Sequence, residues 1–320
     1  MKKVISLIST LAWLATTLLY SSASNGDLSQ VFLSCRDECY SRNCSTPEKQ
    51  KKFYNKHPLI LKLTMWDCLD ECEHQCIWPT VDVFREEHDI VPKFYGKWPF
   101  IRILGSQEIA SSIASLLNLC SHIYMIRIFR KQVRSSSAMY YLWNVTTLVG
   151  INTWFWSFLF HMRDTPFTEK MDYFCAVSAV MYNLYIFIHR TTLGNRALHL
   201  SVGSTMLLFF TYHVYYLSFV RFDYGYNMRV NVAIGLANAL GWITWSLKVR
   251  RQQPYATRCA ISIVITLLFM LLEIWDFPPI LGIFDAHSLW HFGTAPIALL
   301  WYRFGIEDCL YLKKMQFYKT

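Results

Sequence analysis

The chain has 320 residues, of which 53% are hydrophobic and 17% are charged, whereas a typical soluble domain is about 25% charged. This composition excludes a disordered chain and a basic nucleic-acid-binding domain, and it argues against a soluble globular enzyme. The net charge of +9 is uneven, because residues 24–97 carry −2 and residues 98–320 carry +9. A positive balance confined to an apolar region is typical of cytosolic loops in a membrane protein, so we expect no nucleic-acid partner.

Residues 1–23 have the three parts of a secretory signal peptide. Lys2 and Lys3 form a basic start, an apolar stretch follows, and Ser21-Ser22-Ala23 supplies small residues for cleavage. An uncleaved anchor is the alternative interpretation. Either one predicts that the next segment lies on the lumenal side.

Residues 24–97 are expected to form a small lumenal domain held by disulfides. Six of the 10 cysteines fall within it: Cys35, Cys39, Cys44, Cys68, Cys72 and Cys76. A zinc cluster is the alternative, but C-x2-C pairs are missing, and a dense even set after a signal peptide favours disulfides. Cysteines four residues apart share a helix face, which suggests two short helices joined together. Six cysteines allow 15 pairings, and the sequence does not choose among them. Asn43-Cys44-Ser45 is a glycosylation sequon in this domain.

From residue 98 the sequence predicts an all-α membrane domain of seven transmembrane helices. The apolar segments lie near 103–126, 139–161, 171–189, 199–220, 230–247, 258–275 and 284–304. A lumenal start and seven crossings place the C-terminus in the cytosol. The loops on the expected cytosolic side hold most of the Lys and Arg residues, which agrees with the positive-inside rule.

Five polar residues within or beside these segments are the candidate site. Ser157 and His161 lie four apart on the second segment, Asp172 begins the third, and His287 and His291 lie four apart on the seventh. Residues four apart share a helix face. The expected topology places all five near the lumenal boundary. Ionisable groups inside a membrane are costly and usually functional.

Three histidines and an open position form a catalytic zinc site, so we expect His161, His287 and His291 to bind zinc. Zinc would lower the pKa of a bound water to about 7. Asp172 could take a proton from that water or orient a histidine, and Ser157 could stabilise an oxyanion. The alternative for each histidine is an interfacial polar group without a metal.

The same residues resemble the CREST superfamily of membrane hydrolases. Within it, the chain closely resembles the post-GPI-attachment lipid remodelling proteins, a family described as GPI-specific phospholipase A2-like. The strings that carry this resemblance include Cys72-Glu-His-Gln-Cys76, Asn152-Thr-Trp-Phe-Trp-Ser157, His161-Met-Arg-Asp164, Arg221-Phe-Asp-Tyr-Gly-Tyr-Asn227 and Asp285-Ala-His287.

The resemblance implies removal of the sn-2 fatty acid from the glycerolipid of GPI-anchored proteins. Those proteins and membrane lipids would be its partners, and the Golgi or endoplasmic reticulum membrane its location. Three alternatives stay open on the residues alone: a seven-helix receptor with a structural metal, a ceramidase-like lipid amidase, and a trafficking factor for GPI-anchored proteins without catalysis.

Overall fold

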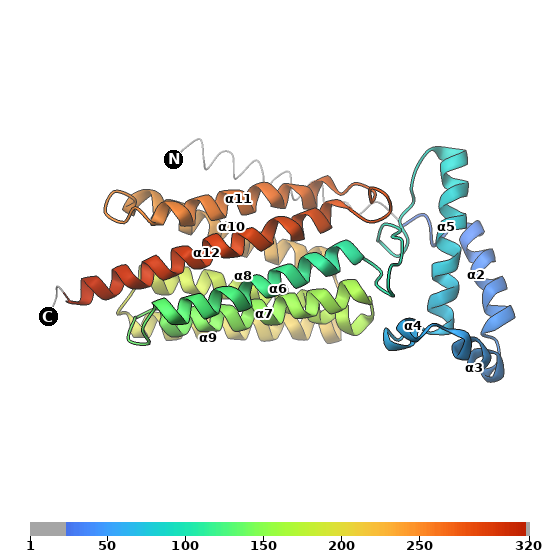
Figure 1. The fold of residues 1–320 in the computed structure, drawn as a ribbon, viewed down its shortest axis with the longest axis horizontal. Coiled ribbons are helices and arrows are strands. Elements are labelled where there is room, and N and C mark those ends of the chain that lie inside the picture. Colours follow the sequence, from blue (N-terminus) through green and yellow to red (C-terminus); the bar gives the residue numbers. More distant parts are fainter. Residues whose placement is uncertain (1–23, 318–320) are drawn as a thin grey trace.

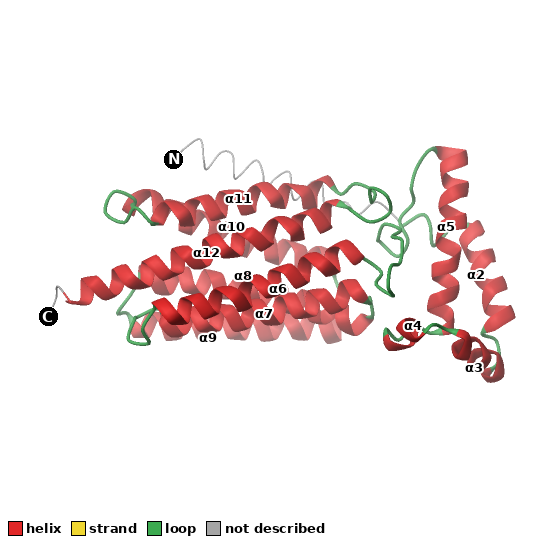
Figure 2. Ribbon diagram, viewed as in Figure 1, coloured by secondary structure: helices red, strands yellow, loops and turns green. Residues whose placement is uncertain are grey.

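The computed structural model describes residues 24–317, so the signal peptide predicted for residues 1–23 lies outside the described residues. Figures 1 and 2 show two parts, a long bundle of parallel and antiparallel helices and a smaller set of helices at one end of it. Throughout the described residues every regular element is a helix, which confirms the all-α prediction.

The smaller part, here called the disulfide module, contains four helices. They are α2 (Gln30–Asn43), α3 (Pro47–Lys56), α4 (Leu59–Leu63) and α5 (Cys68–His88). Ser29 caps α2, and Asp67 with Asp70 forms a capping box at the start of α5. A small core of Phe32, Val81 and Phe94 lies beside the disulfides.

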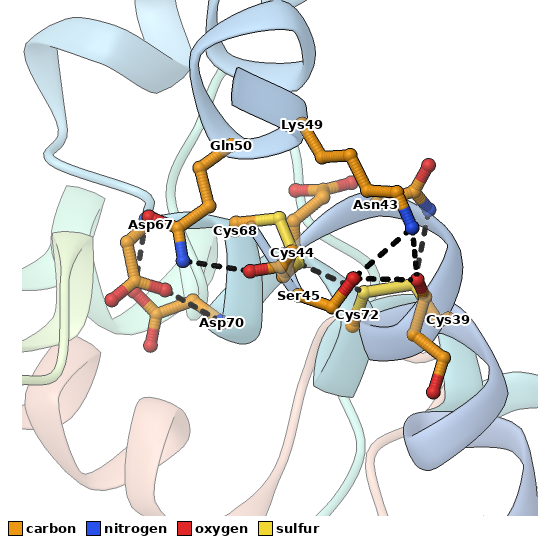
Figure 3. Close-up of a disulfide and its surroundings, with 12 residues drawn as sticks. Cys39, Asn43, Cys44, Ser45, Lys49, Gln50, Asp67, Cys68, Asp70 and Cys72 are labelled. Atoms are coloured by element: carbon orange, nitrogen blue, oxygen red, sulfur yellow. Dashed lines mark hydrogen bonds between the residues drawn. A yellow bond between two sulfur atoms is a disulfide. The ribbon is translucent and has the colours of Figure 1, made fainter. Parts of the chain in front are cut away.

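Three nested disulfides join α2 and its C-terminal end to α5. They are Cys35–Cys76, Cys39–Cys72 and Cys44–Cys68. The two helices are antiparallel, so cysteines spaced by one turn on α2 meet cysteines spaced by one turn on α5. Figure 3 shows the two pairs nearest α3, where the Gln50 side chain donates to the Cys44 carbonyl at 2.7 Å. The disulfide prediction is therefore confirmed, with the pairing that the sequence left open.

Within residues 24–317 the bundle contains seven long helices, at the positions of the seven predicted apolar segments. They are α6 (Ile109–Gln132), α7 (Tyr140–Met162), α8 (Pro166–Thr191), α9 (Arg196–Tyr215, continued by the π-helix η1, Tyr216–Val220), α10 (Tyr224–Val249), α11 (Ala256–Trp275) and α12 (Ala286–Phe317). By length and composition, α6, α8, α9 with η1, α10 and most of α11 are apolar enough to cross a membrane. Five such helices make this a multi-pass membrane protein. The helices α7 and α12, which carry the candidate histidines, are not among these five apolar helices.

Six of the seven helices close into a ring. Going round it, α6 packs on α7, α7 on α8, α8 on α10, α10 on α11, α11 on α12, and α12 returns to α6, while α9 packs outside against α8. The core at the end away from the module contains Trp143, Trp242, Tyr302 and Phe304. Gly305 allows α12 to approach α7 closely, because a Cβ at this position would clash with the Trp143 ring. At this end a buried Arg190–Asp308 ion pair joins α8 to α12.

The disulfide module is fixed to the bundle around one buried tryptophan. The guanidinium groups of Arg102 and Arg163 each lie 4.4 Å from the centre of the Trp66 ring. Arg102 forms an ion pair with Glu71 at 2.6 Å, and Arg163 forms one with Asp70. Cations over an aromatic face are attracted to its negative charge density. These contacts place the module directly over the bundle end that holds the candidate site.

Candidate metal centre

The structure brings the three predicted histidines together between α7 and α12. One ring nitrogen from each of His161, His287 and His291 lies within 4.8 Å of the other two. The ring centroids are 5.2 Å apart for His161–His287, 5.0 Å for His161–His291 and 4.4 Å for His287–His291. His161 and His291 are buried, and His287 is partly buried. Such a cluster could hold a metal ion.

The position of His161 is fixed by the segment that leads into α6. The backbone N–H of Glu108 donates to the His161 carbonyl at 3.0 Å, and the N–H of Gln107 donates to the Met162 carbonyl at 3.1 Å. These bonds use carbonyls that the end of α7 would otherwise leave unpaired. They also bring the Glu108 carboxylate to the His161 ring, where Oε2 accepts from Nδ1 at 2.6 Å.

The positions of His287 and His291 are set by the start of α12. Asp285 and Ser288 form reciprocal caps, in which each side chain accepts from the other's backbone N–H, at 2.8 and 3.0 Å. This fixes the first turn, where His287 lies. Asn118 of α6 donates to the His291 carbonyl at 2.8 Å and so holds the second turn.

The hydrogen bonds determine which nitrogen of two histidines is available. A carboxylate can only accept, so Nδ1 of His161 carries its proton toward Glu108, and Nδ1 of His287 carries its proton toward Glu273 Oε1 at 2.6 Å. In each neutral ring Nε2 then has a free lone pair. Nε2 of His161 is buried without a hydrogen-bond partner among the described residues. A buried nitrogen without a partner, in a ring held by a carboxylate, is typical of a metal ligand.

Two serines, Ser115 and Ser157, form a chain of hydrogen bonds that begins at His291. Its Nδ1 lies 3.2 Å from Ser115 Oγ, and Ser115 Oγ lies 3.1 Å from Ser157 Oγ. If His291 donates to Ser115 and Ser115 donates to Ser157, the Ser157 hydroxyl proton is free to point toward the histidines. The predicted residue Ser157 thus lies two hydrogen bonds from His291, with Ser115 between them, and Ser115 was not among the residues predicted for the site.

Asp172 lies on α8, one turn after Thr168 of the N-terminal capping box. Its partly buried side chain lies near His161 and His287. In the described part of the chain it forms no hydrogen bond or ion pair of its own. The carboxylates that orient the imidazoles are Glu108 and Glu273, which were not among the residues predicted for the site. A histidine that binds a metal through Nε2 needs an acceptor for its Nδ1–H. A carboxylate expected at the same depth in the bundle as such a histidine is therefore the signal that could have identified Glu108 and Glu273.

The fold and this site define a multi-pass membrane protein with a candidate three-histidine metal centre at one end of its helix bundle. The Per1-like family matches residues 58–309, and the chain belongs to that family. The mouse protein named GPI-specific phospholipase A2-like PGAP3 is 43% identical over 295 residues, 92% of each chain. The human protein of the same name is 40% identical over 309 residues, 96% of each chain. The Drosophila melanogaster protein named post-GPI attachment to proteins factor 3 is 43% identical over 297 residues, 90% of each chain.

Proposed function

We propose that this protein remodels the lipid of GPI-anchored proteins by hydrolysing the sn-2 acyl ester of the anchor's glycerolipid, with zinc as its cofactor. The observation that carries the proposal is the cluster of His161, His287 and His291, with ring nitrogens within 4.8 Å. The names of the relatives support the choice of GPI lipid as substrate. The catalytic residues alone do not select this lipid.

The residues present fit a zinc ion. His161, His287 and His291 would hold it, since neutral imidazoles suit zinc and three protein ligands leave one position open. The buried Nε2 of His161 lacks any other partner among the described residues, and Glu108 and Glu273 already fix two of the rings. When bound, zinc would act as a Lewis acid toward the ester and lower the pKa of a bound water.

Asp172 and Ser157 would carry the proton transfer and the charge stabilisation. Asp172 lies near His161 and His287, and its carboxylate forms no hydrogen bond or ion pair among the described residues. It is therefore free to accept the proton of the attacking water. Ser157 would donate its hydroxyl proton to the oxygen that becomes negative as the ester carbonyl is attacked. Ser115 would hold Ser157 in that orientation.

We further propose that all seven helices α6–α12 cross the membrane, with the disulfide module in the lumen and the C-terminus in the cytosol. Disulfides persist in oxidising compartments, which supports a lumenal module. The division would be a signal peptide in 1–23, the Cys-rich domain in 24–97 and the membrane hydrolase in 98–320, in the Golgi or endoplasmic reticulum membrane. An ester just below the lumenal headgroups would then lie at the depth of the histidines.

The test combines metal content with deacylation by the full chain purified in detergent. We expect about one zinc per chain, following the three-histidine rule, and release of a fatty acid from a purified GPI-anchored protein. His161→Ala and His291→Ala should lose both, whereas His88→Ala, whose side chain is 58% exposed on the module, should keep both. A folded wild-type chain without metal would refute the zinc proposal. Bound metal without fatty-acid release would refute the hydrolase.

A further inference from the structure

The disulfide module carries a cluster of exposed apolar side chains on and around the short helix α4. We call this cluster the α4 patch: Leu59, Leu63 and Met65, joined by Leu104 from the linker. Their exposed fractions are 71%, 69%, 71% and 76%. The linker is part of the same surface, because the Trp66 indole N–H donates to the Gly105 carbonyl at 3.3 Å and Gly105 lies against α4. Contiguous apolar surface of this kind marks an interaction site.

The patch residues are not exposed because the α4 segment lacks a buried face. Leu61 and Trp66, between the patch residues in sequence, are 7% and 3% exposed and face the interior. The segment therefore has one apolar face that is already buried and a second apolar face with nothing packed on it in the described residues. A solvent-facing helix normally presents polar residues on its outer face.

The positive charge of the module is concentrated on α3 and α4. Residues 47–65 contain five Lys and one Glu, a net of +4, while the rest of residues 24–97 carries a net of −6. Lys49, Lys51, Lys52 and Lys56 on α3 are exposed. The Lys62 ammonium lies 5.3 Å from the ring centre of Tyr54 and so connects α4 with α3. Lys62 is therefore the lysine that lies beside the apolar residues of α4, and apolar side chains next to a cation are typical of a segment that lies on a membrane surface.

The α4 patch also lies next to the bundle end, where the helices would meet the lipid headgroups. Leu104 is five residues before Ile109, the first residue of α6. In Figure 1, α4 lies on the side of the module that faces the bundle, whereas α2 lies on the far side. The ends of membrane-spanning helices meet the headgroup layer, so α4 reaches that layer while α2 does not.

We propose that the α4 patch, with Lys62 of α4 beside it, docks on the phospholipid surface of the leaflet that surrounds this end of the bundle. Leu59, Leu63, Met65 and Leu104 enter the headgroup layer, and Lys62 contacts lipid phosphates. The module is then held at two places, by Trp66 on the bundle and by α4 on the lipid. The inference depends on the multi-pass character of the chain and not on its proposed activity.

The experiment uses the full chain reconstituted in phosphatidylcholine vesicles, with and without phosphatidylserine. A photo-crosslinking amino acid replaces either Leu63 or Tyr40, an exposed residue of α2. We expect roughly tenfold more lipid cross-linked at 63 than at 40, because only a residue in the headgroup layer reaches lipid. Combining the label at 63 with Lys62→Glu should lower the yield several-fold, most strongly in vesicles that contain phosphatidylserine.

Equal lipid cross-linking at positions 63 and 40 would overturn the proposal. So would cross-linking of position 63 to a second copy of the chain in place of lipid, since the patch would then be a protein interface. Both labelled positions are exposed, so the variants should fold, and unchanged deacylation or metal content in the labelled chains checks this.

Discussion

Replacing Glu108 by glutamine tests whether a buried carboxylate holds His161 for metal binding. The Nδ1–Oε2 distance is 2.6 Å, and only 2% of the His161 side chain and 11% of the Glu108 side chain are exposed. A charge-assisted hydrogen bond is strongest where water is excluded. Glutamine has nearly the same shape, and its amide oxygen can still accept from Nδ1, so the change removes mainly the charge.

The expected loss follows from this geometry. Partners that orient metal-binding histidines contribute roughly 10–100-fold to metal affinity, which corresponds to about 1.4–2.7 kcal/mol. Because the Glu108–His161 pair is almost fully buried, we expect Glu108→Gln to weaken zinc binding by roughly 30–100-fold. The pair Glu273–His287 has the same distance but 26% and 38% exposed side chains. Glu273→Gln should therefore weaken binding less, by roughly tenfold.

The assay is competition for zinc between the purified full chain and a chelator of known affinity. Glu86→Gln, at an exposed position of α5, is the matched control and should bind zinc as the wild type does. If Glu108→Gln kept wild-type affinity while the chain stayed folded, the carboxylate would have no role in the metal site. A larger loss in Glu273→Gln than in Glu108→Gln would show that burial does not set the strength of these contacts.

Three further predictions concern proton transfer, the disulfides and pH. Asp172→Asn should keep bound zinc but lower the deacylation rate by roughly 100-fold or more; loss of zinc would instead give Asp172 an orienting role. Removing Cys39–Cys72 by a double alanine substitution should destabilise the module by about 2 kcal/mol, measured by denaturant unfolding, because the neighbouring disulfides still hold α2 and α5; unchanged stability would show that this bond is redundant. Burial, assisted by Arg102, lowers the pKa of His74 to about 4 from 6.5. The unfolded module therefore binds more protons between these values, and its stability should fall as pH drops from 6.5 to 4, by at most about 1.4 kcal/mol per pH unit. Hydrogen exchange of α5 amides should report this fall, and a His74→Gln chain with the same pH dependence would contradict it.

The sequence predicted the helices well where apolar content decides them and less well at their ends. The first bundle segment was expected near 103–126, but α6 begins at Ile109, because Leu104 and Gly105 have positive φ angles in a turn. It then continues to Gln132, since basic residues can extend a helix beyond the apolar layer. Similarly, α12 continues to Phe317, well past the predicted 304. Hydropathy reports the apolar layer, whereas backbone hydrogen bonds decide where a helix ends.

The candidate site was predictable in its histidines but not in its supporting residues. The i,i+4 pairs and the expected topology brought His161, His287 and His291 to one depth. Glu108 and Ser115, however, meet this group through the closure of α6 on α7 and α12, which no local spacing encodes. The disulfide pairing could not be predicted either, because it depends on the antiparallel contact of α2 with α5, which are distant in sequence. Contacts between distant segments were thus the missing information.

The last helix of the ring has a consequence for how the protein is made. Two of the three clustered histidines lie on α12, the last helix that the structure describes, while His161 lies on α7, more than a hundred residues earlier. During synthesis α7 is complete long before its partners leave the ribosome. A nascent or truncated chain that ends before residue 287 contains Glu108 and His161 but cannot assemble the cluster. The three histidines therefore come together only after α12 has been made and has packed against α6.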